Sequence, residues 1–296
     1  QFTFGLHPVM TEVRNLFASD RLAIIANAGP LVVPLTRQDY TSNSKPRPQA
    51  LGSHNDQQST WQALSPEGAK MGWGGRIGDM IASQNTNQTF TSITAGGSAV
   101  FSAGQTTFQY NVSNGGSTQI GGISGTLFGS PTAATTLRTI ITADNQHLFA
   151  KEYAATVSRS ITAQATFQAA FNASTVTAPT QYNVPSTGQN ANNGLAQQIQ
   201  TVARIIGARN AIGAKRQIFF VSMGGFDTHD MQNPNQADLL ARISHAIGYF
   251  DTVMSNIGGV DMRNNVTLFT ASDFGRTITT NGDGTDHGWG ASHFVV

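Results

Sequence analysis

"QIFFVSM" (residues 217–223) and "VTLFTAS" (266–272) decide the fold that the sequence predicts. Each run is short, continuous and rich in β-branched or aromatic residues, which is typical of the buried strands of a parallel sheet. Between them, residues 235–258 carry apolar side chains at helical i, i+3, i+4 spacing. Strand, helix, strand is a βαβ unit, so we predict that both strands are parallel in one sheet and end at the same edge.

The same alternation of helix and strand occurs earlier in the chain. Residues 192–208 and residues 6–17 each place apolar side chains on one side of a predicted helix. Pro8 suits the first turn of the helix predicted over 6–17. The run "LAIIANAG" (22–29) predicts a third buried strand. Together these elements predict an α/β fold with a mainly parallel sheet flanked by helices.

The middle of the chain has a different pattern. Residues 86–135 alternate Thr, Phe, Val and Ile with Gly and Ser, which predicts short strands and hairpins. Residues 145–172 have a helical pattern, whereas residues 173–193 are rich in Pro, Asn, Thr and Gly, as in a surface loop. We predict that residues 86–193 form a Gly/Thr-rich cap or insertion, partly β and partly helical, within a single domain over residues 1–296.

Composition excludes several classes of function. Charged residues make up 11% of the 296 residues and the net charge is +1 without a run of Lys or Arg, which does not favour nucleic acid as a partner. The sequence has no Cys, so thiolate ligands and cysteine nucleophiles are excluded, and no apolar stretch reaches the roughly 20 residues that span a bilayer. Because the first residue is Gln1 and the final "HFVV" matches the start of a strand, we expect a processed or incomplete chain.

Carboxylates and a histidine follow the two predicted strands of the βαβ unit. "GGFDTHD" (224–230) follows the first strand and "DFGRT" (273–277) follows the second. Because ligand sites in open α/β sheets lie at the carboxyl ends of strands, we expect Asp227, His229 and Asp273 to meet at one edge. Each Asp taken alone also suits a helix cap or a turn. Together they favour a divalent metal, with Zn²⁺ or Mn²⁺ better suited to the mixed donors than Mg²⁺ or Ca²⁺.

The stretch 270–290 concentrates scarce charge, because the whole chain has only 16 acidic residues. Glycines in "GTDHGWG" (284–290) let this loop fold over the metal, so we expect His287 as a third or fourth ligand. Asp286 is predicted either to bind the metal or to orient a ligand. Arg276 is predicted to clamp an anionic phosphate or sulfate group, with a salt bridge to a local Asp as the alternative.

A second concentration of polar residues is "LGSHNDQQSTWQ" (51–62). Ser53 and Asp56 have the spacing of a capping box at the start of a helix. The alternative is catalytic, with Ser53 as a nucleophile or His54 as an acid–base group.

These motifs resemble a known family over nearly the whole chain. The stretches "SHNDQQSTWQ", "SMGGFDTHDMQ", "TASDFGRT" and "NGDGTDHGWGASHFVV" look like the bacterial domain-of-unknown-function-1501 family, whose members are often exported with twin-arginine signals. That family resembles the alkaline phosphatase and sulfatase superfamily, which implies an alkaline-phosphatase-like sheet with metals at its strand ends. The resemblance implies that Asp227 and His229 bind one metal, and that Asp273 and His287 match further superfamily ligands.

The resemblance also has departures. Phe274 stands where the superfamily has a metal-binding His, and the first-strand Asp of the superfamily has no counterpart. We therefore expect one metal ion or none, and we expect that a first strand and a C-terminal segment lie outside the chain. The resulting hypothesis is a periplasmic or extracellular metal-dependent hydrolase of phosphate or sulfate esters. The alternative is a non-catalytic exported protein that keeps the fold and binds a glycan or a protein partner.

Overall fold

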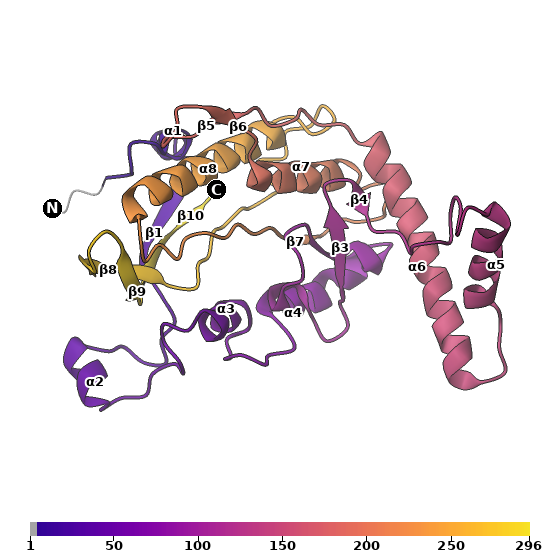
Figure 1. The fold of residues 1–296 in the computed structure, drawn as a ribbon, viewed down its shortest axis with the longest axis horizontal. Coiled ribbons are helices and arrows are strands. Elements are labelled where there is room, and N and C mark those ends of the chain that lie inside the picture. The colour runs from indigo at the N-terminus through magenta and orange to yellow at the C-terminus, as the bar shows by residue number, and fades with distance from the viewer. Residues whose placement is uncertain (1–4) are drawn as a thin grey trace.

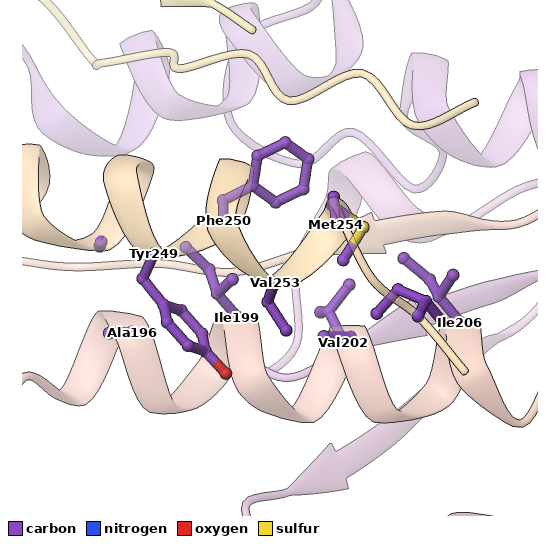
Figure 2. Close-up of a cluster of buried hydrophobic side chains, with 11 residues drawn as sticks. Ala196, Ile199, Val202, Ile206, Tyr249, Phe250, Val253 and Met254 are labelled. Atoms are coloured by element: carbon purple, nitrogen blue, oxygen red, sulfur yellow. The ribbon is translucent and has the colours of Figure 1, made fainter. Parts of the chain in front are cut away.

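Two long helices, α7 (Gly194–Gly207) and α8 (Gln232–Met254), form the centre of the computed structural model, which describes residues 5–296. Their facing sides bury a cluster of apolar side chains, shown in Figure 2, that includes Ile199, Val202 and Met254. The i, i+3, i+4 pattern of both sequences explains this packing, because it places the apolar residues of each helix on one side. The helices predicted over 192–208 and 235–258 are therefore confirmed.

The described residues form eight α-helices and ten short strands. The other helices are α1 (Thr11–Ala18), α2 (Arg37–Ser42), α3 (His54–Ala63), α4 (Trp73–Ile81), α5 (Pro131–Thr142) and α6 (Leu148–Ala173), with 3₁₀ turns η1 (Ala82–Gln84), η2 (Gln88–Phe90) and η3 (Val100–Ser102). The strands are β1 (Ala23–Ala28), β2 (Ser92–Thr94), β3 (Gln109–Ser113), β4 (Gly116–Ser117), β5 (Tyr182–Asn183), β6 (Asn190–Ala191), β7 (Ile218–Phe220), β8 (Gly275–Thr280), β9 (Thr285–Gly288) and β10 (Ala291–Val295).

The largest sheet has the strand order β4-β3-β2-β7. Strand β2 is parallel to both β3 and β7, whereas β4 pairs with β3 in the antiparallel sense. Ile93 of β2 is fully buried in a cluster with Phe167 and Phe171 of α6. A mixed α/β fold with parallel strands is thus confirmed, and residues 86–193 contribute β2, β3 and β4 to the same sheet as β7.

The prediction that 217–223 and 266–272 are parallel strands of one sheet is wrong for the described residues. The main chain of Leu268 exchanges hydrogen bonds with Val296, at 3.0 and 2.8 Å, and Phe269 bridges Val295 in the antiparallel sense. The hydrogen bonds of 266–272 are therefore made to the β10 side. On its other side, a cavity of about 1500 Å³ lined by both segments lies next to β7.

Two further predictions about the amino-terminal part need correction. Strand β1 lies within the predicted 22–29, but its residues are mostly exposed and it pairs antiparallel with β10 rather than within a parallel sheet. Helix α1 begins at Thr11, later than predicted, because residues 7–10 form a turn in which the Met10 amide donates to the His7 carbonyl. Pro8 lies in that turn and not in the first turn of the helix.

Figure 1 shows the layers that position the functional residues. Helices α7 and α8 lie side by side on one side of the extended segments around β7, and α3 and α4 lie on the other side. The long helix α6, predicted over 145–172, packs with α5 at the far end of the molecule from the β8–β9 hairpin. Within residues 5–296, no helix combines the length and apolar character needed to cross a membrane.

The α7–α8 cluster should dominate stability. We expect Met254→Ala to lower the free energy of unfolding by about 2–5 kcal/mol, because Met254 is fully buried and its truncation leaves a cavity. The matched control is Met80→Ala on α4, where the side chain is 79% exposed and the change should stay within about 0.5 kcal/mol. Urea denaturation measures both, and equal losses would show that the cluster is not the stabilising core.

Candidate metal-binding site

Three side chains from distant parts of the sequence converge on one point. His54 Nε2 lies 3.1 Å from Asp227 Oδ2, and His287 Nε2 lies 2.9 Å from Asp227 Oδ1. One ligand atom from each of these residues lies within 4.8 Å of the other two. Nitrogen and carboxylate donors at this spacing match the set that binds Zn²⁺ or Mn²⁺. The sequence predicts Asp227 and His287 as ligands, whereas it predicts an acid–base role for His54.

Each of these residues is positioned by a local element. Asp227 lies on the segment that leaves β7, and His54 is the first residue of α3. His287 lies on β9, directly opposite Arg276 of β8 in the hairpin register. The site therefore depends on the predicted convergence of distant loops, although the segment before Asp273 makes only an isolated bridge to Val295 and is not part of the β7 sheet.

The β8–β9 hairpin is fastened to the segment that carries His229. The Gln232 amide donates to the Asp283 carbonyl at 2.9 Å, and the Asn281 side-chain amide donates to the His229 carbonyl at 3.1 Å. A Cβ atom on Gly284 would lie 2.2 Å from the His229 main chain, so only glycine permits this approach. The hairpin and the 227–232 segment thus form one unit around the site.

Each histidine at the site has its Nδ1 atom next to an oxygen. The distances are 2.8 Å from His54 to Asp273, 2.6 Å from His287 to the Gly52 carbonyl, and 3.3 Å from His229 to Asp286. A carbonyl accepts only, so His287 Nδ1 carries a proton, and the carboxylates favour the same tautomer in the other two rings. The Nε2 atoms of His54 and His287 therefore face Asp227, to which they donate when protonated, and they would bind a cation when neutral.

His229 lies beside the three converging residues. Its Nε2 atom is 2.9 Å from Asp227 Oδ1 and 2.9 Å from His287 Nε2. Two ring nitrogens at this distance must share a proton or a cation, because two lone pairs would repel. The His229 side chain is 45% exposed, so it is the histidine of this group that solvent and a ligand reach most easily.

Arg276 contacts Asp227 and Thr285. Its Nη1 atom donates to Asp227 Oδ1 at 2.7 Å, and its other guanidinium nitrogens donate to the Thr285 hydroxyl and carbonyl. This is the local salt bridge that was the alternative to an anion clamp. Burial raises the pKa of Asp227, but hydrogen bonds from His287, Arg276 and His54 outweigh it and hold that pKa well below its ordinary value. Asp227 is therefore a carboxylate at neutral pH.

Asp273 and Asp286 lie next to the group formed by His54, Asp227 and His287, but they are not part of it. Asp273 accepts hydrogen bonds from His54 and from the Gln58 side chain, the latter at 3.0 Å. Asp286 contacts His229 and Asn281. In this structure both carboxylates are placed to orient histidines, which is one of the two roles predicted for Asp286.

Phe274 closes the site on its apolar side. Its ring centroid lies 4.7 Å from that of His54 and 4.2 Å from that of His287, and the side chain is buried. A phenyl ring offers no lone pair to a metal, so Phe274 contributes packing against the two imidazoles and no ligand.

Ser53 lies outside this hydrogen-bonded group. Its hydroxyl donates to Asp56 at 2.9 Å, and it occupies the N-cap position of α3 without capping a backbone amide. Ser53 therefore occupies the predicted N-cap position, but neither backbone hydrogen bond of a capping box is formed.

Sequence patterns did not predict two parts of the site. Gly52 supplies its carbonyl to His287 from a backbone with φ of +86°, a conformation that favours glycine. The β8–β9 hairpin was expected only as a loop, although Asn281-Gly282 between Thr-rich stretches is a recognised hairpin signal. Gly52 had no sequence signal of its own, because its role depends on a residue 235 positions away.

Comparison with known proteins gives the family. A family model described as "Protein of unknown function (DUF1501)" matches residues 2–296, so the chain belongs to that family. No curated protein matches the chain, and no solved structure matches it.

The contact with Asp273 raises the pKa of His54 above its ordinary value of 6.5, with burial opposing the shift. In metal-free protein, this pair therefore stabilises the fold fully below pH 6.5, and the contribution is lost as pH rises through the His54 pKa. We expect Asp273→Asn to move that pKa towards 6.5 and Asp286→Asn to leave it in place. NMR titration of the His54 ring measures this, and an unshifted pKa in Asp273→Asn would contradict the pairing.

Proposed function

We propose that this member of the DUF1501 family binds one divalent cation, Zn²⁺ or Mn²⁺, through His54, Asp227 and His287. The convergence of their ligand atoms within 4.8 Å carries the proposal. Supporting it, His54 and His287 each have Nδ1 next to an oxygen, so that Nε2 faces Asp227. Catalytic zinc sites commonly combine three protein ligands with an open position, and this set matches that pattern.

We further propose that the site hydrolyses phosphate or sulfate esters. When bound, the cation would polarise an ester oxygen and lower the pKa of a nearby water molecule. His229 is exposed beside the triad and has its Nδ1 next to Asp286, so its Nε2 can take a proton from water or give one to the leaving group. Ser53 is a weaker nucleophile candidate than water because its hydroxyl is bonded to Asp56.

In the proposed reaction, the positive charge of Arg276 offsets the negative charge of Asp227. It neutralises Asp227 at 2.7 Å, so a substrate anion that approaches the cation meets less repulsion from the carboxylate. The guanidinium also orients Asp227, because its remaining nitrogens are fixed by Thr285. The proposed location of the protein, the periplasm or the cell exterior, is supported by the family resemblance alone.

Zinc binding tests the first part of the proposal. His54→Ala and His287→Ala should each abolish measurable binding, whereas Asp273→Asn should weaken it by roughly 10- to 100-fold because it only orients His54. His147→Ala, on an exposed histidine at the start of α6, is the control and should bind like the parent protein. Calorimetric titration of metal-free protein measures these affinities, and tight binding by His287→Ala would refute the assignment.

Ester hydrolysis tests the second part. Zinc- or manganese-loaded protein should turn over at least one of nitrophenyl phosphate, bis-nitrophenyl phosphate and nitrophenyl sulfate, and a chelator should stop it. His229→Ala should retain the metal but lower kcat by about 10²–10⁴-fold, the range for loss of an acid–base group. An unchanged kcat in this variant would remove His229 from the mechanism.

A second candidate function is non-catalytic binding of a glycan or a protein partner. Two observations favour it. Phe274 packs against the site and offers no ligand for a second metal ion. Arg276 is already bonded to Asp227 and is therefore less free to bind a substrate anion. If the protein is non-catalytic, it should still bind zinc through His54, Asp227 and His287 but should hydrolyse none of the three nitrophenyl esters.

A further inference from the structure

The cavity beside β7 extends well beyond the proposed metal site. Its volume is about 1500 Å³, and its lining runs from His54, Asp227 and Asp273 at the site to apolar side chains of the β7 segment and of residues 266–270. Small-molecule pockets occupy roughly 300–1,000 Å³, and protein interiors contain few voids larger than a water molecule. The cavity is therefore larger than a typical ligand pocket and far larger than the voids that a packed interior leaves.

Both sides of the cavity end in unpaired strand edges. Strand β7 is the edge strand of its sheet, with the Ile218 amide bonded to the Thr91 carbonyl on the β2 side. On the opposite side, the Leu268 and Thr270 amides are bonded towards β10. Because successive amides of a strand point to opposite sides, the amides of Phe219, Thr267 and Phe269 face the cavity. Two facing edges of this kind match the position of one missing strand.

The faces of the cavity are apolar on both sides. Phe219 and Leu268 pack against the α7–α8 cluster on one face. On the other face, the Phe101 ring lies 5.9 Å from that of Phe220 and 6.3 Å from that of Phe269. A strand between the two edges would thus be covered by helices above and below, like the central strands of α/β sheets.

Two buried polar atoms in the lining also lack a partner. His293 Nε2 and Trp61 Nε1 are buried without a hydrogen bond among the described residues, and their rings lie 5.0 Å apart. His293 is 5% exposed and lines the cavity. Buried polar groups are nearly always bonded in native proteins, so these atoms indicate that polar groups belong in the cavity.

We propose that the cavity holds a further β-strand of the same polypeptide, from residues outside 1–296, that is parallel to β7 and mainly apolar on both faces, with a polar group beside His293 and Trp61. The direction follows from the flanking segments, which both lead along the chain towards the site, one to Asp227 and one to Asp273. The strand would join the β4-β3-β2-β7 sheet to residues 266–270 and β10. Its carboxyl end would then lie beside Asp227 and Asp273, next to the metal site.

Hydrogen exchange on the natural polypeptide that contains these residues tests the proposal without reference to metal or activity. The amides of Phe219, Thr267 and Phe269 should exchange at least about a hundredfold more slowly than free amides, approaching the protection of Ile218 and Leu268. Rapid exchange at the three positions would overturn the proposal. Protection that appears only at high protein concentration would assign the cavity to a second copy and would overturn it as well.

A proline pair gives an independent measurement. Thr267→Pro removes an amide that should be bonded to the inserted strand, and Leu268→Pro removes an amide bonded to Val296. Proline is tolerated at an edge strand with its amide position facing solvent, but it is destabilising in a central strand. We expect both variants to lower the urea midpoint of the natural polypeptide to a similar extent, whereas an unaffected Thr267→Pro would contradict the proposal.

Discussion

The Asp227 carboxylate is the interaction on which the rest of the site depends. Its two oxygens receive His54, His287, His229 and Arg276, which come from α3, the β8–β9 hairpin and the segment after β7. Four donors around one carboxylate make its ionised form strongly favourable. Without that negative charge, the three histidines and the arginine would lose their shared hydrogen-bond acceptor. The loops that carry these residues would then be held together less strongly.

The sequence predicted the site better than the sheet. Asp227, His229 and Asp273 were expected to meet because they follow strands predicted to end at one edge; His229 does contact Asp227, and His54 contacts both Asp227 and Asp273. Within residues 5–296, the prediction that 217–223 and 266–272 share one sheet was wrong, because periodicity identifies extended, apolar segments but not their neighbours. Residues 266–272 have the composition of a central strand, yet within residues 5–296 their hydrogen bonds are made to the β10 side alone. The apolar character of such a segment can be read from its own residues, whereas its pairing depends on strands from distant parts of the chain.

The role of His54 shows a similar limit. A histidine at the start of a helix suggested acid–base chemistry, because its distance in space from Asp227 and His287 could not be inferred from the chain. Gly52 could not be predicted either, since its carbonyl matters only once His287 lies over it. The β8–β9 hairpin, in contrast, could have been predicted from the Asn-Gly turn signal in the sequence.

At the proposed metal site, protons and a metal ion would compete for the same atoms. Without metal, the short distances between His229, His287 and Asp227 require shared protons, and Asp273 favours the charged form of His54. A divalent cation must displace those protons, because histidine binds metals only through a neutral ring nitrogen. Since Arg276 already neutralises part of the Asp227 charge, the cation gains less from this carboxylate than from an unpaired one. The proposed site would therefore take up metal readily only above the pH at which His54 loses its proton.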